Sequence, residues 1–205
     1  MKICLINGSP KHKDSASERI IESLELRLGD DNEYSRCNSS SVETQGFLDS
    51  ARASDVIVIV FPLYIDGIPS HLLRLLCSAE PFIAGAAPGA KLYVIAHNGF
   101  YEAGQNQTAL DIMRNFCVRA GLDWGQGAGL GASPMIHTVQ AGKGPNKDMG
   151  RTLDKFAGNI ILKQSSDYMF SKPNMPRFLY ISGGNLGWKS QAKKNGIKII
   201  RKRGS

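Results

Sequence analysis

Short apolar runs alternate along most of the chain with segments in which apolar residues recur at helical spacing. The clearest run is VIVIVF at residues 56–61, where no polar residue interrupts the β-branched and aromatic side chains. Such a run is typical of a central parallel strand that is buried on both faces. Residues 3–6 and 91–96 form similar runs, whereas 33–37 and the glycine-rich 124–130 are weaker strand candidates.

The segments between these runs show the three- and four-residue spacing of one helix face. Ile20, Ile21, Leu24 and Leu28 share such a face. Further helices are predicted near 44–53, from Pro69 onwards, over 107–120, and around Met149, Leu153, Phe156 and Ile160. This alternation predicts an α/β fold, a doubly wound five-stranded parallel sheet with helices on both faces.

Three unusual loops follow predicted strands, at residues 7–17, 61–68 and 97–106. In open parallel sheets, ligands bind at the carboxyl ends of the strands, near the point where the strand order reverses. We therefore expect one binding site built from all three loops.

The first loop, NGSPKHKDSAS, has the composition of a phosphate-binding turn. Gly8 permits a close backbone approach, the serines offer hydroxyl donors, and the following helix start has free amides. No Walker motif follows Gly8, and Asn7 stands where a phosphatase would need cysteine. The remaining interpretation is a loop that holds a cofactor phosphate without attacking it. The alternative is an ordinary turn with a serine N-cap.

The second and third loops combine aromatic surface with amide groups. FPLYIDGIPS at 61–70 presents apolar side chains between two prolines, and HNGFYEAGQN at 97–106 adds donors and acceptors. A planar heterocycle with hydrogen-bonding edges matches both loops. For Tyr64 the alternative is packing on the next helix, and for His97 a structural role is favoured over ligand contact.

GSPKHKDSAS, PLYIDGIPS and NGFYEAGQ together resemble the flavodoxin-like NAD(P)H-dependent FMN reductases and quinone reductases, over roughly residues 1–165. The resemblance implies a flavodoxin-like sheet, FMN as cofactor, NAD(P)H as electron donor and a homodimer. It implies that the FMN phosphate is held by Ser9, Lys11, Ser15, Ala16 and Ser17. It implies that the isoalloxazine ring is contacted by Pro62, Leu63, Tyr64, Ile65, Asp66, Asn98, Gly99 and Phe100.

The resulting hypothesis is an oxidoreductase that passes electrons from NAD(P)H through FMN to a small acceptor such as a quinone, nitro compound or free flavin. The alternative is a non-catalytic flavoprotein, either an electron carrier or a flavin-binding interaction module. A hydrolase is disfavoured because no nucleophile elbow is present. No catalytic residue is assigned, although Tyr64, Tyr101 and His97 are candidates for a general acid.

Charge divides the 205-residue chain, which carries a net charge of +7. Residues 168–205 hold nine of the 25 Lys and Arg and no acidic residue, which leaves 16 basic against 18 acidic residues in 1–167. We predict a flavodoxin-like FMN-binding domain at 1–167 and a basic C-terminal extension at 168–205. The extension either docks through Trp188 and nearby isoleucines or forms a solvated arm.

Several features limit the other classes of function. A basic tail on a near-neutral body does not indicate a nucleic-acid-binding domain. No apolar run approaches a membrane span, and no signal segment is expected. Four scattered cysteines and four scattered histidines form no metal motif, which favours reduced thiols in the cytoplasm. GAGLGA at 127–132 imitates a dinucleotide fingerprint but precedes Ser133-Pro134 instead of a helix.

Overall fold

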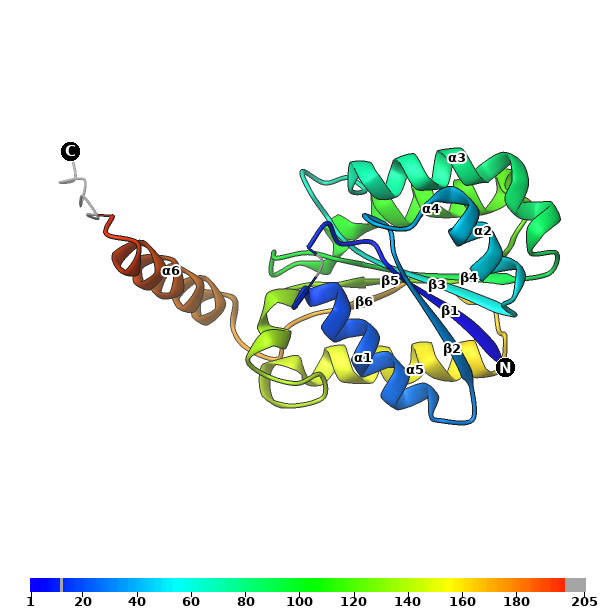
Figure 1. Cartoon of the computed structure of the whole chain (residues 1–205). Helices are drawn as coiled ribbons and strands as arrows, with labels where there is room; N and C mark the ends of the chain where they lie inside the picture. The colour runs from blue at the N-terminus through cyan, green and yellow to red at the C-terminus, as the bar shows by residue number, and fades with distance from the viewer. Residues whose placement is uncertain (12, 198–205) are drawn as a thin grey trace. The chain divides into compact units, whose positions relative to one another are not determined.

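A computed structural model describes residues 1–11 and 13–197, which fall into two compact units, one of residues Met1–Pro173 and one that begins at Asn174 (Figure 1). The strands are β1 (Lys2–Asn7), β2 (Glu33–Asn38), β3 (Val56–Pro62), β4 (Lys91–His97), β5 (Asp123–Leu130) and β6 (Met169–Ser171). The α-helices are α1 (Ala16–Leu28), α2 (Thr44–Arg52), α3 (Ser70–Ala86), α4 (Gln107–Arg119), α5 (Lys147–Ile161) and α6 (Arg177–Lys194). Short 3₁₀ helices are η1 (Ala103–Asn106), η2 (Ser133–His137) and η3 (Gly144–Asn146).

The strands form one parallel sheet in the order β2-β1-β3-β4-β5-β6, so the predicted doubly wound α/β fold is confirmed. The sheet has six strands instead of the predicted five, because Met169–Ser171 pairs with the end of β5. This short strand lies within the segment predicted as the basic extension, and the first compact unit runs on to Pro173.

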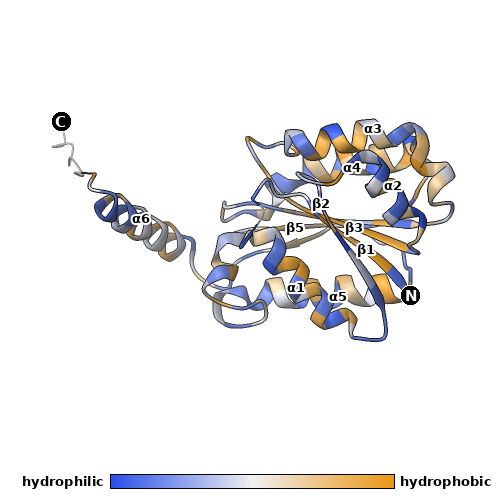
Figure 2. Cartoon of the chain, in the orientation of Figure 1, coloured by the Kyte–Doolittle hydropathy of each residue, from blue (hydrophilic) through white to orange (hydrophobic). Residues whose placement is uncertain are grey.

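Helices cover both faces of the sheet. Figure 1 shows α1 and α5 on one face and α2, α3 and α4 on the other. The strand residues alternate between the two cores: Cys4 and Ile57 join the cluster under α2, α3 and α4, while Ile3 and Val58 join the one under α1 and α5. This two-sided burial explains why the β3 sequence is uniformly apolar. Figure 2 shows the strands in the centre of the sheet, β3 among them, in the hydrophobic colour.

Glycines in β5 leave room for aromatic rings beside the sheet edge. A Cβ added at Gly127 would lie 2.9 Å from the Tyr168 ring, and one at Gly129 would lie 2.6 Å from the Phe170 ring. Within the described residues, GAGLGA is therefore the end of a strand with its following turn, and its glycines accommodate packing.

The second unit contains α6, none of whose residues is buried. Lys189, Lys193 and Lys194 gather toward its C-terminus, where cations interact favourably with the helix dipole. The basic residues Lys198, Arg201, Lys202 and Arg203, with Ile199 and Ile200, lie outside the described residues. Across the described part of the chain, no helix has the length and apolar character needed to cross a membrane.

Candidate functional site

A cavity of about 240 Å³ lies where the loops after β1, β3 and β4 meet. This is the side of the sheet at which the chain order reverses between β1 and β3. Nine of the thirteen predicted site residues line it: Ser9, Lys11, Ser15, Ala16, Pro62, Leu63, Tyr64, Asn98 and Gly99. The structure therefore brings the three predicted loops together.

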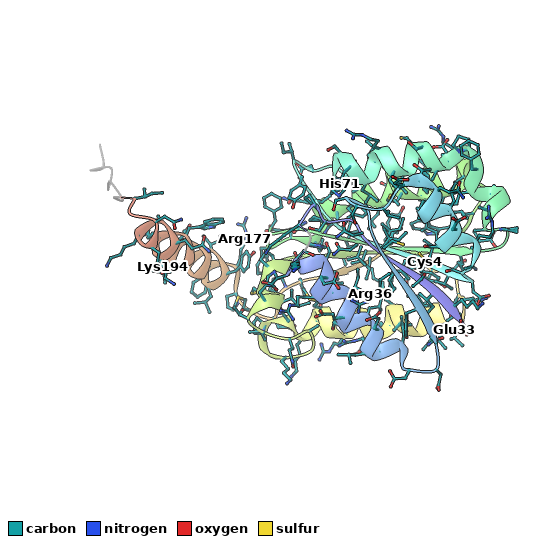
Figure 3. The ribbon with its side chains drawn as sticks, in the orientation of Figure 1. Cys4, Glu33, Arg36, His71, Arg177 and Lys194 are labelled. Carbon is teal, nitrogen blue, oxygen red and sulfur yellow. The ribbon has the colours of Figure 1, made fainter. Side chains whose placement is uncertain are left out.

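Asn7, the last residue of β1, organises the first loop from below. Its buried side-chain oxygen accepts the Ser9 N–H at 2.9 Å, and its Nδ2 donates to Ser15 Oγ at 3.3 Å and to Glu18 Oε2 at 2.9 Å. Glu18 forms an ion pair of 2.6 Å with Arg36 of β2, and Arg36 also pairs with Glu25 of α1. Arg36 is labelled in Figure 3. The loop is thus tied to both α1 and β2.

Ser9 and Ser15 line the cavity, and their side-chain oxygens accept hydrogen bonds from the backbone. Ser9 Oγ accepts the Lys11 N–H at 3.2 Å, and Ser15 Oγ caps α1 by accepting the Glu18 N–H at 3.1 Å. A hydroxyl that accepts from the protein keeps its own proton for donation. Two such donors beside the N-terminus of α1 suit an anionic group.

Asp14 is a cavity residue that the sequence reasoning did not select. Its φ is 51°, and its backbone oxygen accepts from Lys11 Nζ at 2.7 Å. Its carboxylate accepts from Arg19 at 3.1 Å and lies 3.5 Å from His137 Nδ1, and the Arg19 hydrogen bond lowers the pKa of Asp14. The carboxylate therefore stays charged, with its charge countered by Arg19.

The second loop presents apolar side chains from a tight turn. Tyr64 and Gly67 exchange two backbone hydrogen bonds of 3.1 Å, and the two residues between them have φ values of 50° for Ile65 and 58° for Asp66. Positive φ is unfavourable for a β-branched residue. Ile65 is fully exposed and Tyr64 half exposed. Ile65 and Asp66, both predicted ring contacts, are outside the cavity lining.

The third loop is shaped by the side chain of Asn98. Its Oδ1 accepts the Phe100 N–H at 3.0 Å, and its Nδ2 donates to the Glu102 carbonyl at 3.3 Å. The amide expected to face a ligand is thus engaged within the loop, although Asn98 and Gly99 line the cavity. Phe100 is half exposed and lies outside the lining.

Ser17 occupies a different place from the other predicted phosphate-binding residues. It is fully buried, and its hydroxyl lies 2.8 Å from Nε2 of His97. The other ring nitrogen of His97 lies 2.8 Å from Ser133 Oγ. Burial lowers the pKa of His97 to about 3, with a smaller lowering from the neighbouring His137, so the His97 imidazole is neutral at pH 7.

A fourth segment, η2, completes the cavity with Ser133, Pro134 and His137. Sequence reasoning did not include these residues, because it considered 124–132 only as a weak strand and as an imitation of a dinucleotide fingerprint. The Ser133-Pro134 pair that opens η2 was visible in the sequence, but its approach to the other loops depends on the β4–β5 pairing.

The cavity thus combines a donor-rich end at α1 with an aromatic and apolar end at the second and third loops. Hydroxyl protons, a lysine and a helix N-terminus fit a phosphate, while Leu63, Tyr64 and the backbone of residues 98–99 fit a flat ring. These residues suit a ligand with an anionic end and a planar end, as in FMN.

Solved structures similar to this chain share its fold. An NADH:FMN oxidoreductase in its apo form superposes with a TM-score of 0.60 at 16% identity, over 80% of this chain and 90% of that one. The flavoenzyme FerB, an NAD(P)H:(acceptor) oxidoreductase from Paracoccus denitrificans, gives 0.60 at 14% identity, over 78% and 94%. A Streptococcus pneumoniae TIGR4 flavodoxin gives 0.58 at 15% identity, over 80% and 99%.

No protein-family model and no curated protein matches the chain by sequence. At identities of 14–16% the structural similarity defines the fold. The protein therefore has the flavodoxin-like fold predicted from its loops, and its solved neighbours include flavin-dependent oxidoreductases and a flavodoxin.

Proposed function

We propose that the protein is an FMN-dependent oxidoreductase that passes electrons from NAD(P)H to a small acceptor such as a quinone, nitro compound or free flavin. The observation that carries this proposal is the single cavity that joins hydroxyl donors at the start of α1 to Leu63 and Tyr64 at the switch point of the sheet. FMN, when bound, would supply the redox chemistry, and the protein would supply position and electrostatics.

In this proposal the phosphate is held by Ser9, Lys11, Ser15 and Ala16, with Ser17 contributing through its place in the first turn of α1. Pro62, Leu63, Tyr64, Asn98 and Gly99 border the ring, with Ile65, Asp66 and Phe100 at its outer edge. The half-exposed aromatic side chains of Tyr64 and Phe100 leave this end open, so a nicotinamide or an acceptor can reach the ring.

A homodimer in the cytoplasm completes the proposal. Exposed apolar side chains on α3 and α4, namely Leu73, Phe82, Ile112 and Val118, favour a partner surface. All four cysteines are free thiols, as expected for a reducing compartment. Analytical ultracentrifugation tests the dimer, and a monomer at micromolar concentration contradicts it.

Phosphate recognition is tested by replacing Ser9 with Asp. The new carboxylate repels the FMN phosphate and removes a charge-assisted hydrogen bond worth about 1.5–3 kcal/mol. We expect the Kd of FMN to rise at least about tenfold and that of riboflavin to change little. Ser41→Asp, which alters an exposed serine outside the cavity, is the matched control. Equal losses for FMN and riboflavin would place the phosphate elsewhere.

An electron carrier without direct NAD(P)H oxidation is the second candidate, because the flavodoxin superposes almost as well as the oxidoreductases. Anaerobic addition of NADPH or NADH to the FMN-loaded protein separates the two. A reductase loses its flavin absorbance promptly with at least one coenzyme. A carrier keeps it with both and is bleached only by dithionite.

A further inference from the structure

A buried imidazole joins three segments that wall the cavity. His97 ends β4, Ser17 lies in the first turn of α1, and Ser133 begins η2. All three side chains are buried, with exposed fractions of 3% for His97, 0% for Ser17 and 1% for Ser133. Segments separated by 80 and 36 residues in sequence are thereby linked through one ring.

The directions of the hydrogen bonds that link Ser17, His97 and Ser133 follow from the last acceptor in the series, the Asn98 carbonyl. Ser133 Oγ lies 2.9 Å from the Asn98 carbonyl oxygen, which can only accept, so the hydroxyl proton of Ser133 points there. Ser133 Oγ must then accept from Nδ1–H of His97. Because the imidazole is neutral, Nε2 carries the lone pair and accepts the proton of Ser17. These hydrogen bonds therefore select the Nδ1–H tautomer of His97.

The same series of hydrogen bonds holds the third loop in place. The Asn98 carbonyl accepts from both Ser133 Oγ and the Ser133 N–H at 2.9 Å, and the Asn98 N–H donates to the Leu130 carbonyl at 3.0 Å. At the other end, Ser17 belongs to the turn that follows the N-cap Ser15. One ring thus connects the anion-binding end of the cavity to the loop that borders its apolar end.

We propose that His97 is a positioning residue, which in its neutral Nδ1–H form sets the separation and orientation of the phosphate-binding and ring-binding halves of the site. This rests on the proposed function, because FMN is the ligand that spans both halves. Correct spacing lets the two halves bind one ligand cooperatively, and it adds nothing for a fragment that occupies one half alone.

Ser17→Ala tests this role, because it breaks the link to α1 while leaving the imidazole and the third loop in place. FMN, riboflavin and inorganic phosphate are titrated into the whole protein by calorimetry and by flavin fluorescence. We expect the Kd of FMN to rise about tenfold, whereas those of riboflavin and inorganic phosphate change less than about twofold. Ser23→Ala, on the same helix and outside the cavity lining, should change none of the three.

Histidine side-chain ¹⁵N NMR gives a readout that does not depend on flavin. The resonance lost in His97→Gln is expected to show a proton on Nδ1 and none on Nε2. A proton on Nε2 overturns the assigned chain. Equal weakening of all three probes in Ser17→Ala, or no weakening of FMN, overturns the positioning role. Wild-type protein that binds neither flavin overturns the proposed function itself, and the role of His97 with it.

Discussion

The first loop, which follows β1, and the second loop, which follows β3, both contribute residues to the same cavity, but they are built in different ways. Polar groups of the first loop form hydrogen bonds within the loop and to neighbouring residues. Asn7 accepts from Ser9, Ser15 caps α1, and Lys11 donates to the Asp14 carbonyl. The second loop holds Tyr64 and Ile65 out to solvent from a turn with two positive φ values.

The difference indicates how stability and binding are divided between the loops. Hydrogen bonds that form before a ligand binds make a rigid anion site. The conformational entropy of ordering this site is lost on folding and not on binding. A strained turn with exposed apolar side chains costs stability, and such strain concentrates at functional sites. We therefore expect changes in the first loop to lower stability as well as phosphate binding, and changes in the second to alter ring binding without loss of stability.

Gly8→Ala should give the largest effect. A Cβ at this position would lie 2.6 Å from Phe61 Cβ and 2.8 Å from Leu72 Cδ2, and the Phe61 atom is held by the β3 backbone. We expect the free energy of unfolding to fall by about 3 kcal/mol, measured by urea denaturation followed by circular dichroism. Gly85→Ala, an exposed position in α3 with no atom within 4 Å, is the control and should not destabilise. Equal urea midpoints would show that the first loop yields.

Tyr64→Ala, in the second loop, should change binding more than stability. Because the ring is half exposed, we expect a change in the free energy of unfolding of about 0.5 kcal/mol or less. Loss of one aromatic contact worth about 0.5–1.5 kcal/mol should weaken FMN binding by up to about tenfold and alter the bound flavin spectrum. Tyr64→Phe keeps the ring and should behave as wild type. An unchanged spectrum and affinity would make Tyr64 a surface residue only.

The sheet and its three loops were predictable because the evidence for them is local. The run 56–61 and the turn at Gly8 specify a buried strand and a sharp strand-to-helix turn, wherever their neighbours lie. Parallel strands then bring their carboxyl ends to one edge of the sheet. That is why nine of the thirteen selected residues line one cavity.

The remaining features depend on contacts between distant segments, which no periodicity reveals. The pairing of Ser17 with His97 crosses 80 residues, and the serine looked like one more phosphate donor. β6 is only three residues long, and glycines in β5 leave room for the rings of Tyr168 and Phe170 beside it. Asp14 was not selected, and its approach to His137 of η2 is again a contact between distant segments.

Replacing Ile65-Asp66 with Asn-Gly should give the smallest effect on FMN binding, and it separates the two loops most cleanly. Tyr64 and Gly67 close a two-residue turn in which both central residues have positive φ. Asn-Gly is the pair that such turns favour. We expect the free energy of unfolding to rise by about 1 kcal/mol as the strain is relieved.

The same double substitution removes an exposed apolar side chain from the outer edge of the proposed ring site. We therefore expect the Kd of FMN to rise, but by less than about threefold, because Ile65 lies outside the cavity lining. Urea denaturation of the flavin-free protein and flavin fluorescence titration measure the two effects separately. Ile65→Val is the control, since a β-branched residue keeps the strain and most of the apolar surface. If the double substitution leaves stability unchanged or lowers it, the turn is not strained, and exposure alone distinguishes the second loop from the first.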